Sequence, residues 1–402
     1  MMPERASLIA TLPLFLLLPL AGCGEGGGGA AGGAADDAAV DPADGGSAAS
    51  GAVAYQGDGF RVVAVTRGLE HPWGMAFLPD GGILVTERAG RLRLVRDGVL
   101  DPAPITGVPA VWANGQGGLL DVALHPDFAE NGWVYLSFSK PGPGGETATT
   151  AVVRGRLDGH ALTGVEEIFE ADAWTRAGVH FGSRLVFDGE GRLFVTVGDR
   201  GQMERAQDPS NHQGTINRLN DDGSIPDDNP FVGRAGHEPS IWAYGIRSPQ
   251  GLSLQPATGE LIETEHGPRG GDELNHIRPG RNYGWPAISF GINYDGTVLT
   301  EDTARAGMEQ PLHYWVPSIA TSGLAFYTGD RFPQWRGSAF VGGLAGTVLA
   351  RVEMDGLEAV SEERLLADWG ERIRDVRDGP DGFLYLLTDV ARGGLYRLEP
   401  TR

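Results

Sequence analysis

From Phe60 onward the chain repeats one pattern of apolar and polar positions. A short apolar segment leads into a turn of Pro, Asp and Gly, and a second segment rich in β-branched and aromatic residues follows. Clear copies are GMAFLPDGGILVT at 74–86, SRLVFDGEGRLFVTV at 183–197 and VRDGPDGFLYLLT at 376–388. Looser copies occupy residues 121–138, 251–264 and 323–341. Asp-Gly between alternating apolar runs is typical of β-hairpins, so the pattern predicts an all-β protein.

The spacing of these copies predicts how the strands are organised. Equivalent positions in successive copies lie 47 to 72 residues apart, at or above the roughly 40–50 residues of a propeller blade. Six copies therefore predict a six-bladed β-propeller, one domain at 59–402. Strands expected at 61–66 and 395–398 can pair in one blade and close the ring, which leaves few exposed edges. Two packed β-sandwiches are the alternative fold.

The N-terminal segment has the pattern of a targeting signal. Residues 8–20 form an apolar run that is too short to span a bilayer comfortably and suits the core of a signal peptide. The run ends in Leu-Ala-Gly-Cys, which resembles a bacterial lipobox with Cys23 at the cleavage point. A stray buried cysteine is the alternative. We expect residues 1–22 to be a lipoprotein signal peptide and Cys23 to be lipidated.

Residues 23–58 consist mainly of Gly, Ala, Ser and Asp, with almost no large apolar side chain. Such a stretch buries too little surface to offset its ordering entropy, so we expect a flexible tether that starts at the lipidated cysteine. The protein would then lie in the bacterial cell envelope, facing the periplasm or the exterior. It would contact the membrane only through its lipid anchor.

Composition excludes several classes of function. The net charge of −21 disfavours nucleic-acid binding, which normally needs a basic surface. One cysteine excludes a disulfide framework and a cysteine-based zinc site. The sequence also lacks the G-x-S-x-G, HExxH and Walker motifs of common hydrolases and nucleotide-binding proteins. The 63 Gly and 26 Pro suit the many turns of a strand repeat.

Four segments carry polar residues that a plain strand repeat does not need. Gln116 lies among three glycines in NGQGGLLD, His180 precedes a strand in VHFGSRL, and Arg247 lies in IWAYGIRSPQGL. The fourth segment, 263–286, gathers carboxylates, Gly-Pro carbonyls and aromatic residues, and oxygen ligands of these kinds suit Ca²⁺. A neutral imidazole suits a general base, and a guanidinium suits an oxyanion. Taken singly, each segment also fits a solvated turn, a structural histidine, a surface ion pair or an acidic loop.

Together these segments resemble the soluble PQQ-dependent aldose sugar dehydrogenases, the glucose/sorbosone dehydrogenase family. The resemblance covers roughly residues 68–398. It rests on seven strings in family order: GQGGLLDVALHPDF, HFGSRLVFD, GSIPDDNPF, IWAYGIRSPQGL, EHGPRGGDE, NYGWP and RIRDVRDGPDG. The resemblance implies a six-bladed propeller that oxidises aldose sugars at C1 to lactones, using pyrroloquinoline quinone (PQQ), Ca²⁺ and an external electron acceptor.

The resemblance also implies roles for individual residues. His180 would be the general base for the sugar C1 hydroxyl, with hydride passing to the quinone, and Arg247 would stabilise the developing charge. The other residues that it implies as cofactor contacts are Gln116, Ser248, Arg372 and Arg374. The carbonyls of Gly267 and Pro268 would bind a Ca²⁺ that also holds the quinone, and Glu273 and Tyr283 match a second, structural Ca²⁺ site.

Two positions depart from the family pattern. The family has Asn where this chain has Ser248, and Lys where it has Ala345; the only lysine, Lys140, lies in another loop. A lost charge-assisted contact costs about 1.5–3 kcal/mol, so we expect weaker or rearranged cofactor binding. Two alternative functions stay open: a calcium-dependent lactonase-type propeller, and a non-catalytic propeller that binds carbohydrate or a partner.

Overall fold

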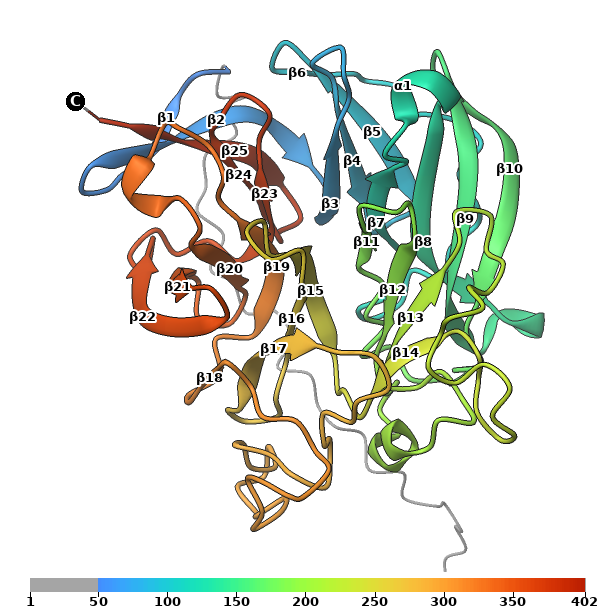
Figure 1. The fold of residues 1–402 in the computed structure, drawn as a ribbon. Coiled ribbons are helices and arrows are strands. Elements are labelled where there is room, and N and C mark those ends of the chain that lie inside the picture. The colour runs from blue at the N-terminus through green and yellow to red at the C-terminus, as the bar shows by residue number, and fades with distance from the viewer. Residues whose placement is uncertain (1–49, 402) are drawn as a thin grey trace, which may run out of the picture. The chain divides into compact units, whose positions relative to one another are not determined.

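The computed structural model describes residues 50–401, which form six antiparallel sheets (Figure 1). Blade one contains β3 (Pro72–Phe77), β4 (Ile83–Glu87), β5 (Arg91–Arg96) and β6 (Val99–Leu100). Blade two contains β7 (Leu119–Leu124), β8 (Trp133–Pro141), β9 (Ala148–Asp158) and β10 (Ala161–Glu170). Blade three contains β11 (Leu185–Phe187), β12 (Leu193–Val197), β13 (Thr215–Leu219) and β14 (Ile241–Tyr244).

The second half of the chain builds the other three sheets. Blade four contains β15 (Pro249–Leu254), β16 (Leu261–Glu265), β17 (Asp272–Ile277) and β18 (His313–Trp315). Blade five contains β19 (Thr321–Phe326), β20 (Ala339–Gly343), β21 (Leu349–Asp355) and β22 (Glu358–Leu365). Blade six contains β23 (Ile373–Asp378), β24 (Leu384–Thr388), β25 (Gly393–Pro400), β2 (Phe60–Leu69) and β1 (Val53–Gln56).

The sheets surround one axis, because the first strand of each blade contacts the first strand of the next and β23 contacts β3. The predicted six-bladed β-propeller is therefore confirmed, and the sandwich alternative is wrong. The helix α1 (Phe128–Asn131) and three short 3₁₀ turns at 143–145, 203–207 and 333–335 lie in loops. Of the helices in residues 50–401, none is long and apolar enough to cross a bilayer.

Blade six joins the two ends of the folded region. β2 pairs with β25 from Phe60 opposite Pro400 to Leu69 opposite Gly393, as the pairing of 61–66 with 395–398 predicted. β1 pairs with β2, so the sheet already includes residues 53–56, which the sequence assigned to the tether. Tyr55 adds a contact that the linker-like composition does not indicate, since its hydroxyl donates to Asp368 at 2.5 Å. Cys23 and the predicted signal peptide lie outside the described residues.

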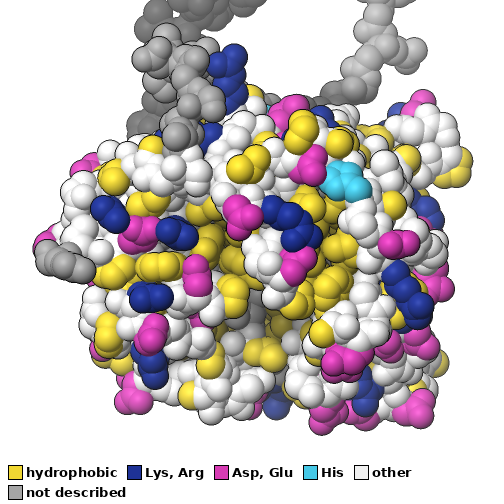
Figure 2. Space-filling model, turned by 90° about the horizontal axis from the view of Figure 1, so that it is seen from above, with side chains coloured by type: hydrophobic (Ala, Val, Ile, Leu, Met, Phe, Trp, Pro, Cys, Tyr) yellow, Lys and Arg dark blue, Asp and Glu magenta, His cyan; other side chains and the backbone are white. Residues whose placement is uncertain are grey.

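Apolar side chains pack between neighbouring blades. Leu84 of blade one and Leu119 and Leu136 of blade two are fully buried in one such cluster. Each fully buried leucine stabilises the fold by about 1.5–3 kcal/mol relative to an exposed one. Figure 2 shows one face of the molecule, with hydrophobic side chains in a central recess between lobes whose surface carries charges of both signs. The propeller is thus held by apolar contacts between sheets.

An ion network lies among the first strands, where they surround the axis. Arg184 Nη1 lies 3.2 Å from Asp121 Oδ1 and 2.8 Å from Asp375 Oδ1, and all three side chains are at most 1% exposed. Arg377 contacts the same two carboxylates at 2.8 and 3.0 Å. The Arg184 guanidinium also stacks 4.2 Å from the centre of the Trp73 ring. Two arginines and two aspartates therefore link blades two, three and six, and the stacking on Trp73 adds blade one.

Antiparallel pairing decides where the loops gather. The start of each first strand lies opposite the end of the second, as Pro249 does opposite Glu265 and Pro72 opposite Glu87. Residues just before the first strands and just after the second strands therefore meet at one face of the ring, which we call the mouth. In blade five, Thr321 opposite Gly343 occupies the same position. His180, Arg247 and Arg372 all stand at such strand ends.

Candidate functional site

His180 is held at the mouth, ahead of β11, by two contacts. Its backbone N–H donates to Gln116 Oε1 at 2.8 Å, and its Nδ1 lies 2.6 Å from Asp199 Oδ1. The residue adopts a φ of 52°, which is uncommon for side chains with a Cβ. Gln116 and His180, which come from separate sequence segments, are therefore brought together.

Asp199, which the sequence reading missed, orients the imidazole. It follows β12 and is almost fully buried. Its Oδ1 also accepts the Gly201 N–H at 2.8 Å, and its Oδ2 accepts the Trp285 indole N–H at 2.8 Å. With Nδ1–H donated to this carboxylate, Nε2 of His180 is the acceptor nitrogen. The signal available in the sequence was an Asp directly after a second strand, in VGDR.

The protonation states of this pair suit a general base. Burial lowers the pKa of His180, the nearby Arg247 cation lowers it further, and Asp199 opposes both effects. Burial works against ionisation of Asp199, but its interactions with His180, Arg247 and the Gly201 N–H together lower the pKa of the carboxyl. Near pH 7 the site therefore holds a neutral imidazole beside a carboxylate.

Arg247 lies next to this pair and is 5% exposed. Its backbone carbonyl accepts the Asp199 N–H at 2.8 Å, and its Nη1 donates to the carbonyls of His266 at 3.0 Å and Gly267 at 2.8 Å. Nη2 reaches the hydroxyl of Tyr294, a 66% exposed side chain that the sequence did not single out. The Gly267 carbonyl, which the resemblance assigned to Ca²⁺, thus faces a guanidinium. The Gly267 carbonyl as it stands therefore does not fit that calcium site.

A cluster of buried carboxylates lies behind Arg247. The Asn275 amide is 3.3 Å from Glu263 Oε2, 3.4 Å from Glu265 Oε1 and 3.3 Å from Glu273 Oε2. Glu263 Oε1 is buried with no partner in residues 50–401. Burial and neighbouring glutamates raise the pKa values of Glu263 and Glu265 well above normal. Burial raises the pKa of Glu273 to about 7.

The negative charge of these carboxylates must be balanced by protons or by a cation, and a calcium ion fits this need. The resemblance had placed Glu273 in a calcium site. Tyr283 lines a small cavity together with Glu265 and Glu273. Its hydroxyl, however, already donates to the His276 carbonyl at 2.5 Å and accepts the Arg278 N–H at 2.8 Å. Only the Tyr283 carbonyl is left as a ligand. In the described part of the chain, no three acidic, imidazole or thiol groups are already arranged around one point as ligands.

Arg372 and Arg374 stand at the start of β23, on the blade-six side of the mouth. Arg374 forms an ion pair with Asp389 and donates to Gln250 Oε1 at 3.0 Å. Arg372 lies 3.9 Å from the same carboxylate and is 44% exposed. Its Nη1 donates to the Leu344 carbonyl, beside the exposed Ala345. Burial opposes ionisation of Asp389, but Arg374 lowers its pKa strongly, so Asp389 is ionised. The Asp389 carboxylate therefore holds the guanidinium groups of Arg374 and Arg372 in place.

Buried polar atoms without partners gather near the mouth. Within residues 50–401 they include Arg88 Nε, Ser248 Oγ, His266 Nε2, Thr321 Oγ1 and Arg374 Nε. All five residues stand at the start of a first strand or just after a second strand. Buried polar groups normally have partners, so a cluster of exceptions marks a place for a polar ligand. With the nearby arginines, this donor set fits an anionic cofactor.

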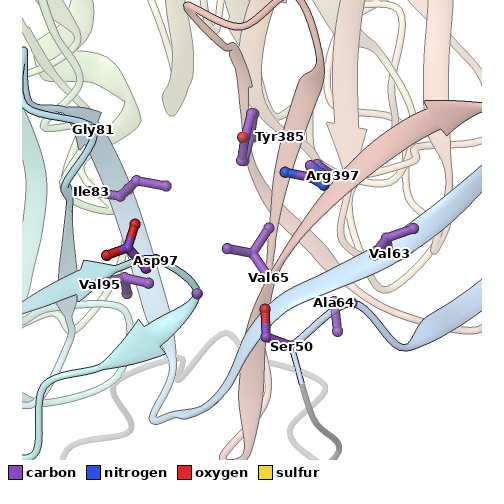
Figure 3. Close-up of a pocket in the computed structure, with 12 residues that line it drawn as sticks. Ser50, Val63, Ala64, Val65, Gly81, Ile83, Val95, Asp97, Tyr385 and Arg397 are labelled. Carbon is purple, nitrogen blue, oxygen red and sulfur yellow. The ribbon is translucent and has the colours of Figure 1, made fainter.

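A larger cavity, of about 280 Å³, lies elsewhere, at the seam between blades one and six. Figure 3 shows its lining, with Ile83 and Asp97 from blade one and Val65, Tyr385 and Arg397 from blade six. None of the residues predicted for the site lines it. This cavity is therefore separate from the predicted site residues, which lie at the mouth.

Known proteins match the chain over nearly all of its folded part. The family model for glucose/sorbosone dehydrogenases matches residues 69–397. Aldose sugar dehydrogenase YliI of Escherichia coli is 48% identical over 337 residues, which is 83% of this chain and 91% of that protein. The solved apo-form of the soluble E. coli aldose sugar dehydrogenase is 47% identical, with a TM-score of 0.82 over 85% of this chain and 100% of that one.

A structure with bound cofactor is also similar. The PQQ-bound aldose sugar dehydrogenase of Streptomyces coelicolor is 28% identical, with a TM-score of 0.71 over 84% of this chain and 96% of that chain. The expected family membership is confirmed by these matches. The chain belongs to the glucose/sorbosone dehydrogenase family.

Proposed function

We propose that this protein is a PQQ-dependent aldose sugar dehydrogenase that oxidises the sugar at C1 to a lactone. The observation that carries the proposal is the His180–Asp199 pair beside Arg247, 2.6 Å between Nδ1 and Oδ1. A neutral, oriented imidazole next to a fixed cation suits removal of a hydroxyl proton as negative charge develops nearby. The named activities of the matched dehydrogenases support the same reaction.

In the proposed mechanism His180 Nε2 takes the proton of the C1 hydroxyl. Asp199 holds the imidazole in that tautomer and stabilises the imidazolium that forms. Arg247, kept in place by the carbonyls of His266 and Gly267, supplies a fixed positive charge beside the reacting atoms. When bound, PQQ would supply the two-electron oxidant for the C1 carbon, and an external electron acceptor would regenerate it.

Five side chains would hold the cofactor: Gln116, Arg247, Ser248, Arg372 and Arg374. The arginines suit its carboxylates, because a guanidinium binds a carboxylate with paired hydrogen bonds. Ser248 Oγ is buried without a partner among residues 50–401, so it is free to contact a ligand despite being shorter than asparagine. No catalytic step is assigned to Ca²⁺ at Gly267 and Pro268, because Arg247 occupies the Gly267 carbonyl.

Reconstitution tests the proposed function directly. Purified apo-protein mixed with PQQ and Ca²⁺ is expected to reduce an artificial electron-accepting dye with a panel of aldoses and to shift the PQQ absorption spectrum. The same preparation without PQQ is the control. The absence of both dye reduction and a spectral change would contradict the proposal. Hydrolysis of lactones without PQQ would favour the lactonase alternative instead.

Calcium is expected to stabilise the fold through Glu263, Glu265 and Glu273. Because their pKa values are raised, the calcium-free protein loses stability as pH rises from about 4.5 through about 7, where Glu273 loses its proton. Calcium at a hundred times its Kd would restore about 2.7 kcal/mol. We expect a higher Tm with Ca²⁺ than with EDTA at pH 8, and a smaller difference at pH 5.5. A Glu273→Gln variant should lose most of the gain; equal Tm values at pH 8 would contradict the site.

The N-terminal assignments stay predictions, because Cys23 and the signal peptide lie outside the described residues. We propose a lipid anchor on Cys23 and a tether that ends before β1, which would keep the propeller in the cell envelope. Radiolabelled palmitate should appear in the wild-type protein and be absent from a Cys23→Ser variant. Equal labelling of both would refute the anchor.

A further inference from the structure

Arg88 follows β4 and stands at the mouth on the blade-one side. Its Nη1 donates to the Gly115 carbonyl at 3.0 Å, and its own carbonyl accepts the Leu119 N–H at 3.1 Å. Gly115 precedes Gln116, whose side chain holds the His180 backbone. The Arg88 side chain therefore lies along the loop that carries one of the predicted cofactor contacts.

Arg88 forms no ion pair with a carboxylate among residues 50–401. The ion pairs at this part of the mouth join Asp389 to Arg374, Arg372 and His71, and none includes Arg88. Its Nε is buried with no acceptor, while Nη1 is used by Gly115. A partly buried cation without a partner is unfavourable on its own. The chain has a net charge of −21, so carboxylates are plentiful and a partly buried arginine would normally be paired with one.

The unused edge of the Arg88 guanidinium suits a carboxylate ligand. Its Nε–H and the neighbouring Nη2–H point the same way and can bind the two oxygens of a carboxylate side by side. Arg88 also acts electrostatically on Asp389, the carboxylate that orders Arg372 and Arg374, so it stands near those two arginines. We propose that Arg88 is a further cofactor-binding residue, which holds a carboxylate of PQQ from blade one. This inference rests on the proposed function.

Two variants separate charge from loop anchoring. Arg88→Gln can still donate to the Gly115 carbonyl but has no charge, whereas Arg88→Lys keeps the charge. Arg96→Gln is the matched control, because it removes one positive charge from the same blade at the opposite end, where Arg96 pairs with the exposed Asp80. Tm values verify that each variant folds. The probe is PQQ itself, titrated into apo-protein and followed by tryptophan fluorescence and PQQ absorbance at several salt concentrations.

We expect Arg88→Gln to weaken PQQ binding about ten- to a hundredfold and to reduce the salt dependence of Kd. Arg88→Lys should lose less than Arg88→Gln and keep the wild-type salt dependence, and Arg96→Gln should bind as wild type. Equal losses in both Arg88 variants with unchanged salt dependence would show that Arg88 only anchors the loop. Wild-type affinity in Arg88→Gln would also overturn the inference. Failure of the wild-type protein to bind PQQ would instead overturn the proposed function, and this inference with it.

Discussion

Replacing His180 with alanine is expected to lower kcat for aldose oxidation by about 10²–10⁴-fold while PQQ still binds. In the proposed mechanism the imidazole is the base that takes the C1 hydroxyl proton, whereas the arginines and Gln116 would hold the cofactor. The measurement compares kcat with the Kd for PQQ, obtained separately by titration. Retained turnover would mean that His180 is not the base, and lost PQQ binding would mean that it is a cofactor ligand.

The pH profile of the wild-type enzyme gives a second measure of the same group. Burial and Arg247 lower the pKa of His180, so the base form should persist below the value of about 6.5 for a free imidazole. We expect kcat/KM to fall on the acid side with a midpoint below pH 6.5. Asp199→Asn removes the group that opposes this shift and favours the wrong tautomer, so it should lower kcat strongly and move the midpoint further down.

The blades were predictable because their signals are local. An Asp-Gly turn and the apolar runs beside it lie within about fifteen residues, as in 74–86, and the resulting hairpins pair in the structure. The closing pair of β2 and β25 was predictable from ring geometry, since an unpaired edge is unfavourable. β1 was not, because residues 50–58 have the composition of a linker and gain their stability from contacts such as Tyr55 with Asp368, 313 residues apart.

The site was predictable only in part, because several of its contacts join residues that are far apart in the sequence. His180, Arg247 and Gln116 stand in recognisable strings, whereas Asp199, Tyr294 and Asp389 acquire their roles from neighbours that folding brings close. Asp389 meets His71 across 318 residues of sequence, and Trp285 meets Asp199 across 86. Turn residues and apolar periodicity do not predict such contacts. Antiparallel pairing predicts part of them, because it places the residues that follow each second strand at the mouth.

Removal of the Asp375 carboxylate is expected to be the most destabilising substitution in the propeller. Asp375 accepts from Arg184 Nη1 at 2.8 Å, Arg377 Nε at 3.0 Å and the Met75 N–H at 3.2 Å. Asp375→Ala leaves two arginines among the first strands facing Asp121 alone. Breaking a buried pair in this way costs about 3–5 kcal/mol. The free energy of unfolding in urea, followed by tryptophan fluorescence, measures the loss.

The double variant Arg184→Met/Asp375→Leu decides whether charge imbalance causes that loss. It removes one charge of each sign and leaves Arg377 paired with Asp121 at 2.8 Å, so the interior stays balanced. Replacing a buried ion pair with apolar groups of similar size is often neutral or stabilising, and the double variant should therefore be more stable than Asp375→Ala. Glu146→Ala, which breaks an exposed pair with Arg176, is the control and should change stability by less than about 1 kcal/mol. A double variant as unstable as Asp375→Ala would mean that the hydrogen bonds of the network, and not its charge balance, hold the first strands together.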